Sequence, residues 1–317
     1  MRGHLLGLGA LLALGAVYPY AFPAYLTLAI TVLLFAGWAT AWDVLGGWNG
    51  QVSLGHASFV GLGAYFVALG QARYDMAPWW SIVLAVLVAA ALAYAWGRLT
   101  FSLRGPYFTL STIAFAEILR LVAINEGWLT GGATGVFIAT LPEPFGVDLF
   151  ARRTQFYLAL AFAGLVIATV AIVSHLRFGY QLRAVREDED AAMAAGIDPT
   201  NIKLKAFMLS GALTALGGGI HGIVLSFLEP HALFALLISV QIALTGIIGG
   251  RGTVWGPAVG ALLLIGSGEI FRTTFAEANL LIYGLLILVV VLFLPRGVVG
   301  ELSRNFARRR YANRAQG

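Results

Sequence analysis

Apolar runs long enough to cross a membrane follow one another along almost the whole sequence. A helix needs roughly 17 to 25 mainly apolar residues to span the hydrocarbon core of a bilayer. About ten such runs can be marked off: Leu5–Phe22, Ala24–Val44, Leu54–Gly70, Trp79–Trp96, Tyr107–Ala123, Phe156–Val173, Ala206–Phe227, Ala232–Ile248, Trp255–Phe271 and Ala278–Leu294. We therefore predict an all-α membrane protein with about ten transmembrane helices, forming a single domain over residues 1–317.

The composition supports this fold class. Only 11% of the residues are charged and 59% are hydrophobic, whereas soluble domains carry about 25% charged residues. Because the chain has no cysteine, disulfides, zinc–cysteine sites and iron–sulfur clusters are excluded. The first run follows Arg2 and also fits a cleaved signal peptide, but the later runs need membrane insertion in any case, so we keep it as a helix.

Basic residues are distributed unevenly between the two sides of the membrane. With ten spans both termini share one side, and 15 of the 20 lysines and arginines fall there, which leaves 5 for the other side. Basic residues are retained preferentially in short cytoplasmic loops, so we expect both termini in the cytoplasm. The basic tail, about residues 296–317, is interpreted as an anchor beside anionic lipid headgroups and not as a nucleic-acid-binding arm.

The longest predicted cytoplasmic connection, about residues 177–205, is too charged to span the membrane. Arg183–Ala195 consists of good helix formers, and Gly196 is placed as a C-terminal stop. Asp198 and Pro199 then supply an N-cap and a first residue for the next helix. Two interpretations are open: an amphipathic strap resting on the bilayer, or a rigid helix that docks a cytoplasmic partner.

Motifs that would give the chain chemistry of its own are missing. No G-x-x-x-x-G-K-[ST] sequence precedes the only lysines, Lys203 and Lys205, so no loop is built to cradle a nucleotide phosphate. Neither H-E-x-x-H nor G-x-S-x-G occurs. We expect no catalytic residue, no metal site and no cofactor in this chain.

The stretch GGWNGQVSLGHASFVGLGAY, residues 46–65, is unusually rich in glycine and polar residues. Small residues recur at helical spacing along it and favour close packing against another helix: Ser53, Ala57, Gly61 and Ala64. The glycines and amides before them predict irregular backbone, which survives at membrane depth only against protein or a watery cavity. His56 and Ser58 are interpreted either as a hydrogen-bonded pair between helices or as part of a transport route.

A second polar group lies in the fifth span, where Thr109 and Thr112 share one face and Glu117 is one turn from Arg120. A charge at this depth costs about 2.5 to 3.5 kcal/mol on insertion scales. Either Glu117 and Arg120 neutralise each other, or Glu117 and the threonines contact a transported substrate. The same two interpretations apply, with structure favoured, to His221, Gln241, Thr245, Glu269 and Arg272.

Several motifs together carry a resemblance to a known family. They are the stretch 46–65, LRGPYFTLSTIAFAEILR (103–120), LTGGATGV (129–136), the acidic loop around Glu189 to Gly196, and GGRGTVWGPAVGA (249–261). In this order, over about residues 24–300, the sequence resembles the LivM-type membrane permease subunit of branched-chain amino acid ABC importers. The loop lacks the clean Glu-Ala-Ala of other importers.

The resemblance implies a permease in a bacterial plasma membrane, importing branched-chain or related hydrophobic amino acids. It implies four kinds of partner: a LivH-type permease, two cytoplasmic ATPases that hold ATP and magnesium, an extracytoplasmic binding protein, and the lipid bilayer. It also implies that residues 181–197 form the coupling helix on an ATPase. The outer connection, residues 125–155, is interpreted either as the docking surface of the binding protein or as a simple cover over the helix ends.

The candidate residues form two sets. The translocation-path candidates are Gln51, Ser53, His56, Ser58, Thr109, Thr112 and Glu117. The ATPase-coupling candidates are Arg183, Arg186, Glu187, Glu189, Asp190, Ala192 and Gly196. Alternative functions are import of urea, amides or aromatic acids, a transporter or channel that works alone, and a membrane enzyme, which would need a nucleophile and base brought together by the fold.

Overall fold

The computed structural model describes residues 2–103, 106–138, 141, 146–268, 284 and 297–301. Its long helices are α1 (Arg2–Ala21), α2 (Leu26–Asp43), α3 (His56–Tyr74), α4 (Pro78–Thr100), α5 (Pro106–Asn125), α7 (Arg152–His175), α10 (Pro199–Leu225) and α12 (Leu236–Gly249). Its shorter helices are α6 (Gly127–Thr130), α8 (Arg177–Glu187), α9 (Glu189–Ala194), α11 (Pro230–Leu233) and α13 (Gly256–Ala261). There are also two short 3-10 helices, η1 (Pro23–Tyr25) and η3 (Gly132–Thr134), and two π-helical turns, η2 (Val44–Trp48) and η5 (Leu262–Gly266). Two short strands are β1 (Val136–Phe137) and β2 (Phe227–Leu228).

Length and composition confirm a multi-pass membrane protein. Among the described residues seven helical segments are long and apolar enough to cross a bilayer. α3 has the length, 19 residues, but is less apolar, and the α13–η5 segment, Gly256–Gly266, is shorter. The predicted fold class is therefore correct. The tenth predicted span, Ala278–Leu294, and the end of the ninth lie outside the described residues.

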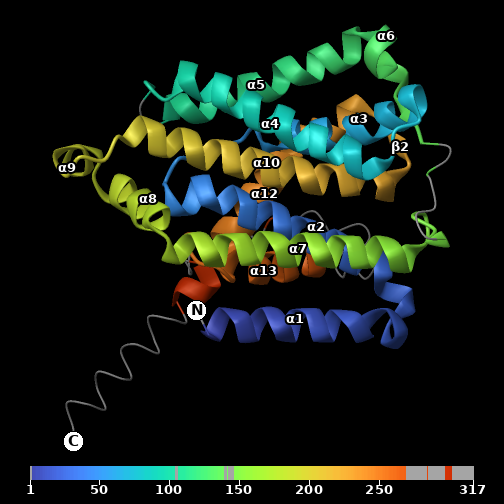
Figure 1. Ribbon diagram of the computed structural model, residues 1–317, viewed down its shortest axis with the longest axis horizontal. Helices are drawn as coiled ribbons and strands as arrows, with labels where there is room; N and C mark the ends of the chain where they lie inside the picture. Colours follow the sequence, from blue (N-terminus) through green and yellow to red (C-terminus); the bar gives the residue numbers. More distant parts are fainter. Residues whose placement is uncertain are drawn as a thin grey trace, which may run out of the picture.

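The helices lie roughly parallel to one another in layers (Figure 1). α1 runs along one edge and packs on α7, while α5 runs along the opposite edge beside α3 and α4. α10 and α2 form the centre, because α10 contacts α3, α4, α2 and α7, and α2 also contacts α12 and α13. The two ends of the molecule are named here the α8 end, which carries α8 and α9, and the β1 end, which carries β1 and β2.

Small residues allow the two central neighbours α3 and α10 to approach closely. A Cβ atom on Gly63 would lie 2.1 Å from the carbonyl oxygen of Ala215, and one on Gly218 would lie 2.3 Å from that of Val60. In lipid, where apolar surfaces gain little by association, such close van der Waals contact holds helices together. Of the predicted stripe, Ala57, Gly61 and Ala64 are buried in α3.

Three predicted helices differ from those observed. The third begins at His56 and not at Leu54, because residues 49–55 are not helical. The eighth is interrupted between α11 and α12, at Phe234 and Ala235. The predicted loop helix Arg183–Ala195 is two helices, since the Asp188 carboxylate accepts hydrogen bonds from the backbone nitrogens of Asp190 and Ala191 and so begins a new helix.

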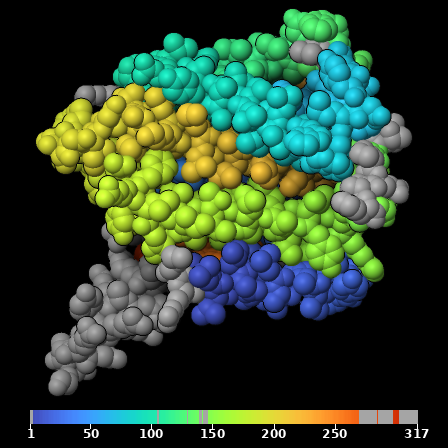
Figure 2. Space-filling model, viewed as in Figure 1, coloured from blue at the N-terminus to red at the C-terminus, as the bar shows by residue number. Residues whose placement is uncertain are grey.

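The ends of the loop helices follow the sequence signals. Gly196 has φ +80°, the left-handed conformation expected of a helix stop. Asp198 caps α10 by accepting a hydrogen bond from the nitrogen of Asn201, and Pro199 is the first residue of that helix. α8 and α9 project from one end of the molecule (yellow-green and yellow in Figure 2).

At the β1 end two connections are joined by a short antiparallel strand pair. Val136 pairs with Leu228 and Phe137 with Phe227. The strand β1 belongs to the connection between α5 and α7, and β2 to the link between α10 and α11. The long predicted outer connection is therefore attached to the end of the central helix α10.

Candidate functional site

The non-helical segment 49–55 passes from the α8 end toward the middle of the molecule. It begins after η2 and ends at His56, the first residue of α3. The His56 ring contacts Ser210, which lies about 17 Å along α10 from Pro199 at a rise of 1.5 Å per residue. α3 therefore starts roughly halfway through the membrane-spanning body, with irregular backbone leading to it.

Side chains of neighbouring helices satisfy the backbone of this segment. Trp42 of α2 donates its indole N–H to the carbonyl of Ser53 (2.8 Å). Thr109 of α5 donates to the carbonyl of Val52 (2.8 Å), and the Thr112 hydroxyl accepts from the nitrogen of Leu54 (3.0 Å). An unpaired backbone group at this depth costs several kcal/mol, so these contacts hold the segment in an irregular conformation.

His56 and Ala57 join the start of α3 to two more helices. The His56 Nε2 atom lies 2.7 Å from the Ser210 hydroxyl of α10, and its Nδ1 atom lies 3.1 Å from the Ser53 hydroxyl. Beside it, the Ser239 hydroxyl of α12 accepts a hydrogen bond from the nitrogen of Ala57 (2.8 Å). We call Ser53, His56, Thr112, Ser210 and Ser239 the buried polar cluster; each of these residues is 0% exposed.

The His56–Ser210 contact has the distance of a base and a nucleophile, the pair that a membrane enzyme would need. Both residues are 0% exposed, so no substrate atom can approach the hydroxyl in this conformation. The hydroxyl instead ties α10 to the start of α3. The geometry is that of a hydrogen bond between helices.

The other path candidates lie around the cluster. Ser58 is buried and bonds back to the carbonyl of Gly55 (2.5 Å), whereas Gln51 and Thr109 are half-buried. Glu117 is separate, on the exposed face of α5, where it forms an ion pair with Arg120 (2.5 Å). Arg120 also lies 3.1 Å from the Nδ1 atom of His231 in α11. The structure thus brings together all path candidates except Glu117.

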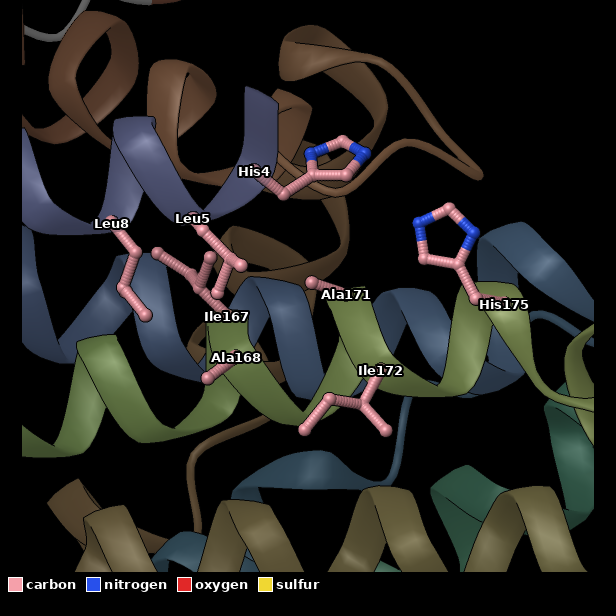
Figure 3. Close-up of a pocket in the computed structure, with 8 residues that line it drawn as sticks. All are labelled: His4, Leu5, Leu8, Ile167, Ala168, Ala171, Ile172 and His175. Atoms are coloured by element: carbon pink, nitrogen blue, oxygen red, sulfur yellow. The ribbon is translucent and has the colours of Figure 1, made fainter. Parts of the chain in front are cut away.

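A shallow cleft elsewhere in the molecule is almost entirely apolar. It lies between α1 and α7, where leucine, isoleucine and alanine side chains form its walls (Figure 3). His4 and His175 stand at its rim with ring centroids 6.0 Å apart. Because only the two histidines offer a polar partner to a ligand, the candidate site is placed at the segment 49–55 and not here.

The coupling candidates on α9 and at the ends of the loop helices differ in exposure. Glu187, Asp190 and Gly196 are exposed, whereas Ala192 is buried. Glu189 forms an ion pair with Lys203 of α10 (2.5 Å). This ion pair fixes α9 against α10.

Arg183 and Arg186 contact the helical body. The guanidinium carbon of Arg183 lies 5.3 Å from the ring centroid of Trp48. Arg186 donates to the carbonyl of Gly47 (2.7 Å). α8 is therefore fastened to η2, the turn that leads into the segment 49–55.

Comparison with known proteins identifies the family. Residues 22–291 match the model of the branched-chain amino acid transport system permease component. The chain belongs to this permease family. It is 28% identical to the high-affinity branched-chain amino acid transport system permease protein LivM of Salmonella typhimurium and to that of Escherichia coli K12, over 92% of this chain and 73% of each relative. No solved structure matches.

A third relative matches a smaller part of the chain. The ribose import permease protein RbsC of Bacillus subtilis is 26% identical over 58% of this chain and 57% of that protein. The homologues are permease components of ABC transporters and not enzymes. The close contact of His56 and Ser210 is therefore interpreted as part of a permease fold.

Three residues of the permease site were not predicted from the sequence. Ser210 and Ser239 carry no signal, because single serines are common in membrane helices. Asp43 does carry one: it is the acidic residue inside an otherwise apolar helix, and it is 0% exposed. Such a residue needs a buried partner, and the structure supplies it at Gly252.

Proposed function

We propose that this chain is the transmembrane subunit of an ATP-driven ABC importer of branched-chain or related hydrophobic amino acids, delivered by an extracytoplasmic binding protein. The observation that carries the proposal is the match of residues 22–291 to permease components of that transport system. Two LivM relatives that cover most of the chain favour branched-chain amino acids as substrates. ATP and magnesium would be bound by a partner ATPase.

The charge distribution supports an orientation with the α8 end in the cytoplasm. Basic residues of the described part gather toward that end: Arg98, Arg177, Arg183, Arg186, Lys203, Lys205 and Arg251. Under the positive-inside rule this end remains cytoplasmic in a bacterial plasma membrane. Both termini belong to the same side in this arrangement, and two ATPases would dock there.

The exposed face of α5 is proposed to face a second, LivH-type permease. Glu117 and Arg120 lie on this face, and Glu117 is about 12 Å inside the Asn125 end of the helix at 1.5 Å per residue. An ion pair facing lipid at this depth would be costly, whereas a protein partner or a watery path between two permeases would accommodate it. The translocation path would then run between α5 and the partner.

The contact surface for the ATPase is proposed to be the outward side of α8 and α9. Tyr180 and Met193 are 58% and 50% exposed there, beside the exposed acids Glu187 and Asp190. Apolar side chains rimmed by charges are typical of protein interfaces. Arg183 and Arg186, which contact η2, would instead transmit movement of α8 to the helical body.

The proposal is tested by reconstituting this permease with its permease, ATPase and binding-protein partners in liposomes. We expect leucine uptake that needs ATP and stops when the catalytic lysine of the ATPase is replaced. Equal uptake by this chain alone would instead indicate a secondary transporter. Urea, amides and aromatic acids are alternative substrates, and a thermal-shift screen of the partner binding protein distinguishes them.

The ATPase surface has its own test. Met193→Glu should reduce copurification of the tagged permease with the ATPase by about tenfold or more, since it buries a charge in an apolar contact. Val147→Glu alters a residue of similar exposure, 45%, in the connection at the β1 end and should leave copurification unchanged. Equal loss in both variants, or in neither, contradicts the assignment.

A further inference from the structure

The helix α8 holds the end of α2 through two arginines one turn apart. Arg186 donates from Nη1 to the carbonyl of Gly47 at 2.7 Å, and Arg183 lies over the ring of Trp48 at 5.3 Å. Gly47 and Trp48 belong to η2, a π-helical turn. Single π-helical turns occur frequently at functional sites.

The same turn is tied to the connection between α12 and α13. Both carboxylate oxygens of the fully buried Asp43 accept from the backbone nitrogen of Gly252, at 3.0 and 2.9 Å. Gly252 has φ +72°, which favours glycine. Arg186 reaches this point as well, since a Cβ on Gly252 would lie 2.9 Å from its Nη1 atom.

The absence of a side chain at Gly47 brings these groups together. A Cβ there would lie 1.8 Å from the Asp43 Oδ1 atom and 2.5 Å from the Gly252 nitrogen. Asp43, Gly47, Arg186 and Gly252 therefore meet at one point, from α2, η2, α8 and the α12–α13 turn. We call these four residues the α2 joint.

The segment 49–55, which leads to the buried polar cluster, comes directly after the joint in the chain. η2 ends at Trp48, and Gln51 donates its backbone nitrogen to the carbonyl of Leu45 at 3.0 Å. The segment has no helix of its own to absorb a displacement. The Gln51–Leu45 hydrogen bond is therefore a direct link between η2 and the segment.

Asn49 shows that the start of this segment is not fully satisfied in the present conformation. It is 1% exposed, and neither its Oδ1 nor its Nδ2 atom has a hydrogen-bond partner among the described residues. A buried unpaired amide costs about 1 to 3 kcal/mol per group. A second arrangement of the segment, in which the amide is paired, would remove this cost.

We propose that the α2 joint transmits movement of α8 to the segment 49–55, so that Asp43, Arg186 and Gly252 are positioning residues for transport. This inference rests on the proposed function, in which an ATPase moves α8. It assigns to Asp43 and Gly252, which lie away from the ATPase surface, a role in coupling hydrolysis to uptake.

The test uses the complete transporter in liposomes, with ATP hydrolysis and leucine uptake measured on the same preparation. In Asp43→Asn one of the two acceptor oxygens that face the Gly252 nitrogen is replaced by an NH₂ group. We expect uptake to fall about tenfold or more, the scale of leaving a buried backbone N–H without a good acceptor, while hydrolysis stays within about twofold. Arg186→Gln, at a residue 41% exposed in its side chain, should do the same while Asp43 itself is unchanged.

Gly252→Ala has a matched control in Gly146→Ala. Both glycines have positive φ, +72° and +74°, but a Cβ on Gly146 would meet none of the described residues within 4 Å. Backbone strain is therefore similar in the two variants, and only the first disturbs Arg186. We expect Gly252→Ala to lose uptake and Gly146→Ala to keep it.

A second readout reports on the segment directly. The chain has no cysteine, so Gln51→Cys introduces a single reactive thiol. In a transporter that carries only Gln51→Cys, the labelling rate of this thiol should change when ATP binds. The change should disappear when Arg186→Gln is added. The role of the α2 joint is overturned if the nucleotide-dependent change in labelling persists in Arg186→Gln, or if uptake and hydrolysis fall in equal proportion in the joint variants. If the unsubstituted transporter shows no ATP-dependent uptake, the proposed function itself is overturned.

Discussion

At the scale of single residues, polar side chains of separate helices substitute for the backbone hydrogen bonds that the segment 49–55 cannot make. Thr112 is central, since its hydroxyl accepts from the nitrogen of Leu54 and donates to the carbonyl of Thr109 (2.8 Å). Thr112 is 0% exposed. Loss of its hydroxyl would leave a buried backbone N–H without a partner.

Thr112→Val tests this role, because valine keeps the shape of threonine and removes the hydroxyl. We expect a loss of about 1 to 3 kcal/mol in stability, seen as a lower melting temperature of the purified permease. The control is Thr31→Val, whose half-exposed hydroxyl bonds only to the carbonyl of Thr27 in its own helix. Equal melting temperatures for the two variants would contradict the role given to Thr112.

The role of a residue could be predicted where it is determined by its neighbours in the sequence. Gly196 and Asp198 were placed correctly because a helix stop and an N-cap are set by their immediate neighbours. Asp188 was missed as a cap since Arg183–Ala195 is helix-forming throughout. Which hydroxyls meet His56 could not be predicted, because Ser210 is 154 residues away in sequence.

At the scale of elements, the packing of α3 on α10 depends on glycines at the contact. Gly63 leaves no room for a methyl group, since a Cβ would lie 2.1 Å from the carbonyl oxygen of Ala215 and 2.7 Å from the nitrogen of Gly219. These atoms are backbone and cannot rotate away. The helices would have to separate to accept any larger residue.

Gly63→Ala should therefore destabilise the permease although alanine is the better helix former. Overpacking of this kind costs about 1 to 3 kcal/mol. Gly9→Ala in α1, where a Cβ meets nothing within 4 Å, provides the comparison and should be neutral or slightly stabilising. Thermal unfolding in detergent measures both, and a stabilised Gly63→Ala would refute the close contact.

Most elements were predictable from apolar run length, which fixed the order of the spans. The non-helical breaks between these spans were harder to predict. Residues 54 and 55 are apolar or small and are compatible with helix, but the hydrogen bonds that hold this segment in its irregular conformation come from α2 and α5. The glycines and amides predicted irregular backbone before α3, but the residue at which α3 starts was decided by tertiary contacts.

At the scale of the whole molecule, the two edge helices present different surfaces. α1 exposes Leu6 and Leu14, at 76% and 75%, which suits lipid. α5 exposes Glu117 beside its apolar side chains. The difference is consistent with our proposal that a second permease covers α5, while lipid would cover α1.

Cysteine cross-linking tests this arrangement, since the chain has no thiol of its own. Ala114→Cys, on the exposed side of α5, should cross-link to single cysteines in the second permease of the assembled transporter. Leu14→Cys in α1 should react with a lipid-phase maleimide and form no such cross-link. The reverse pattern would place the partner against α1 and contradict the arrangement.

The start of α3 has a consequence for how the chain is made. Its backbone depends on the hydroxyl of Ser239, which lies 182 residues later in sequence than Ala57. While the first half is being synthesised and inserted, that N–H has no such acceptor. The amino-terminal half therefore reaches its final packing only after α12 has been inserted. We expect a chain truncated before residue 236 to insert its early helices without forming the hydrogen bond at the start of α3.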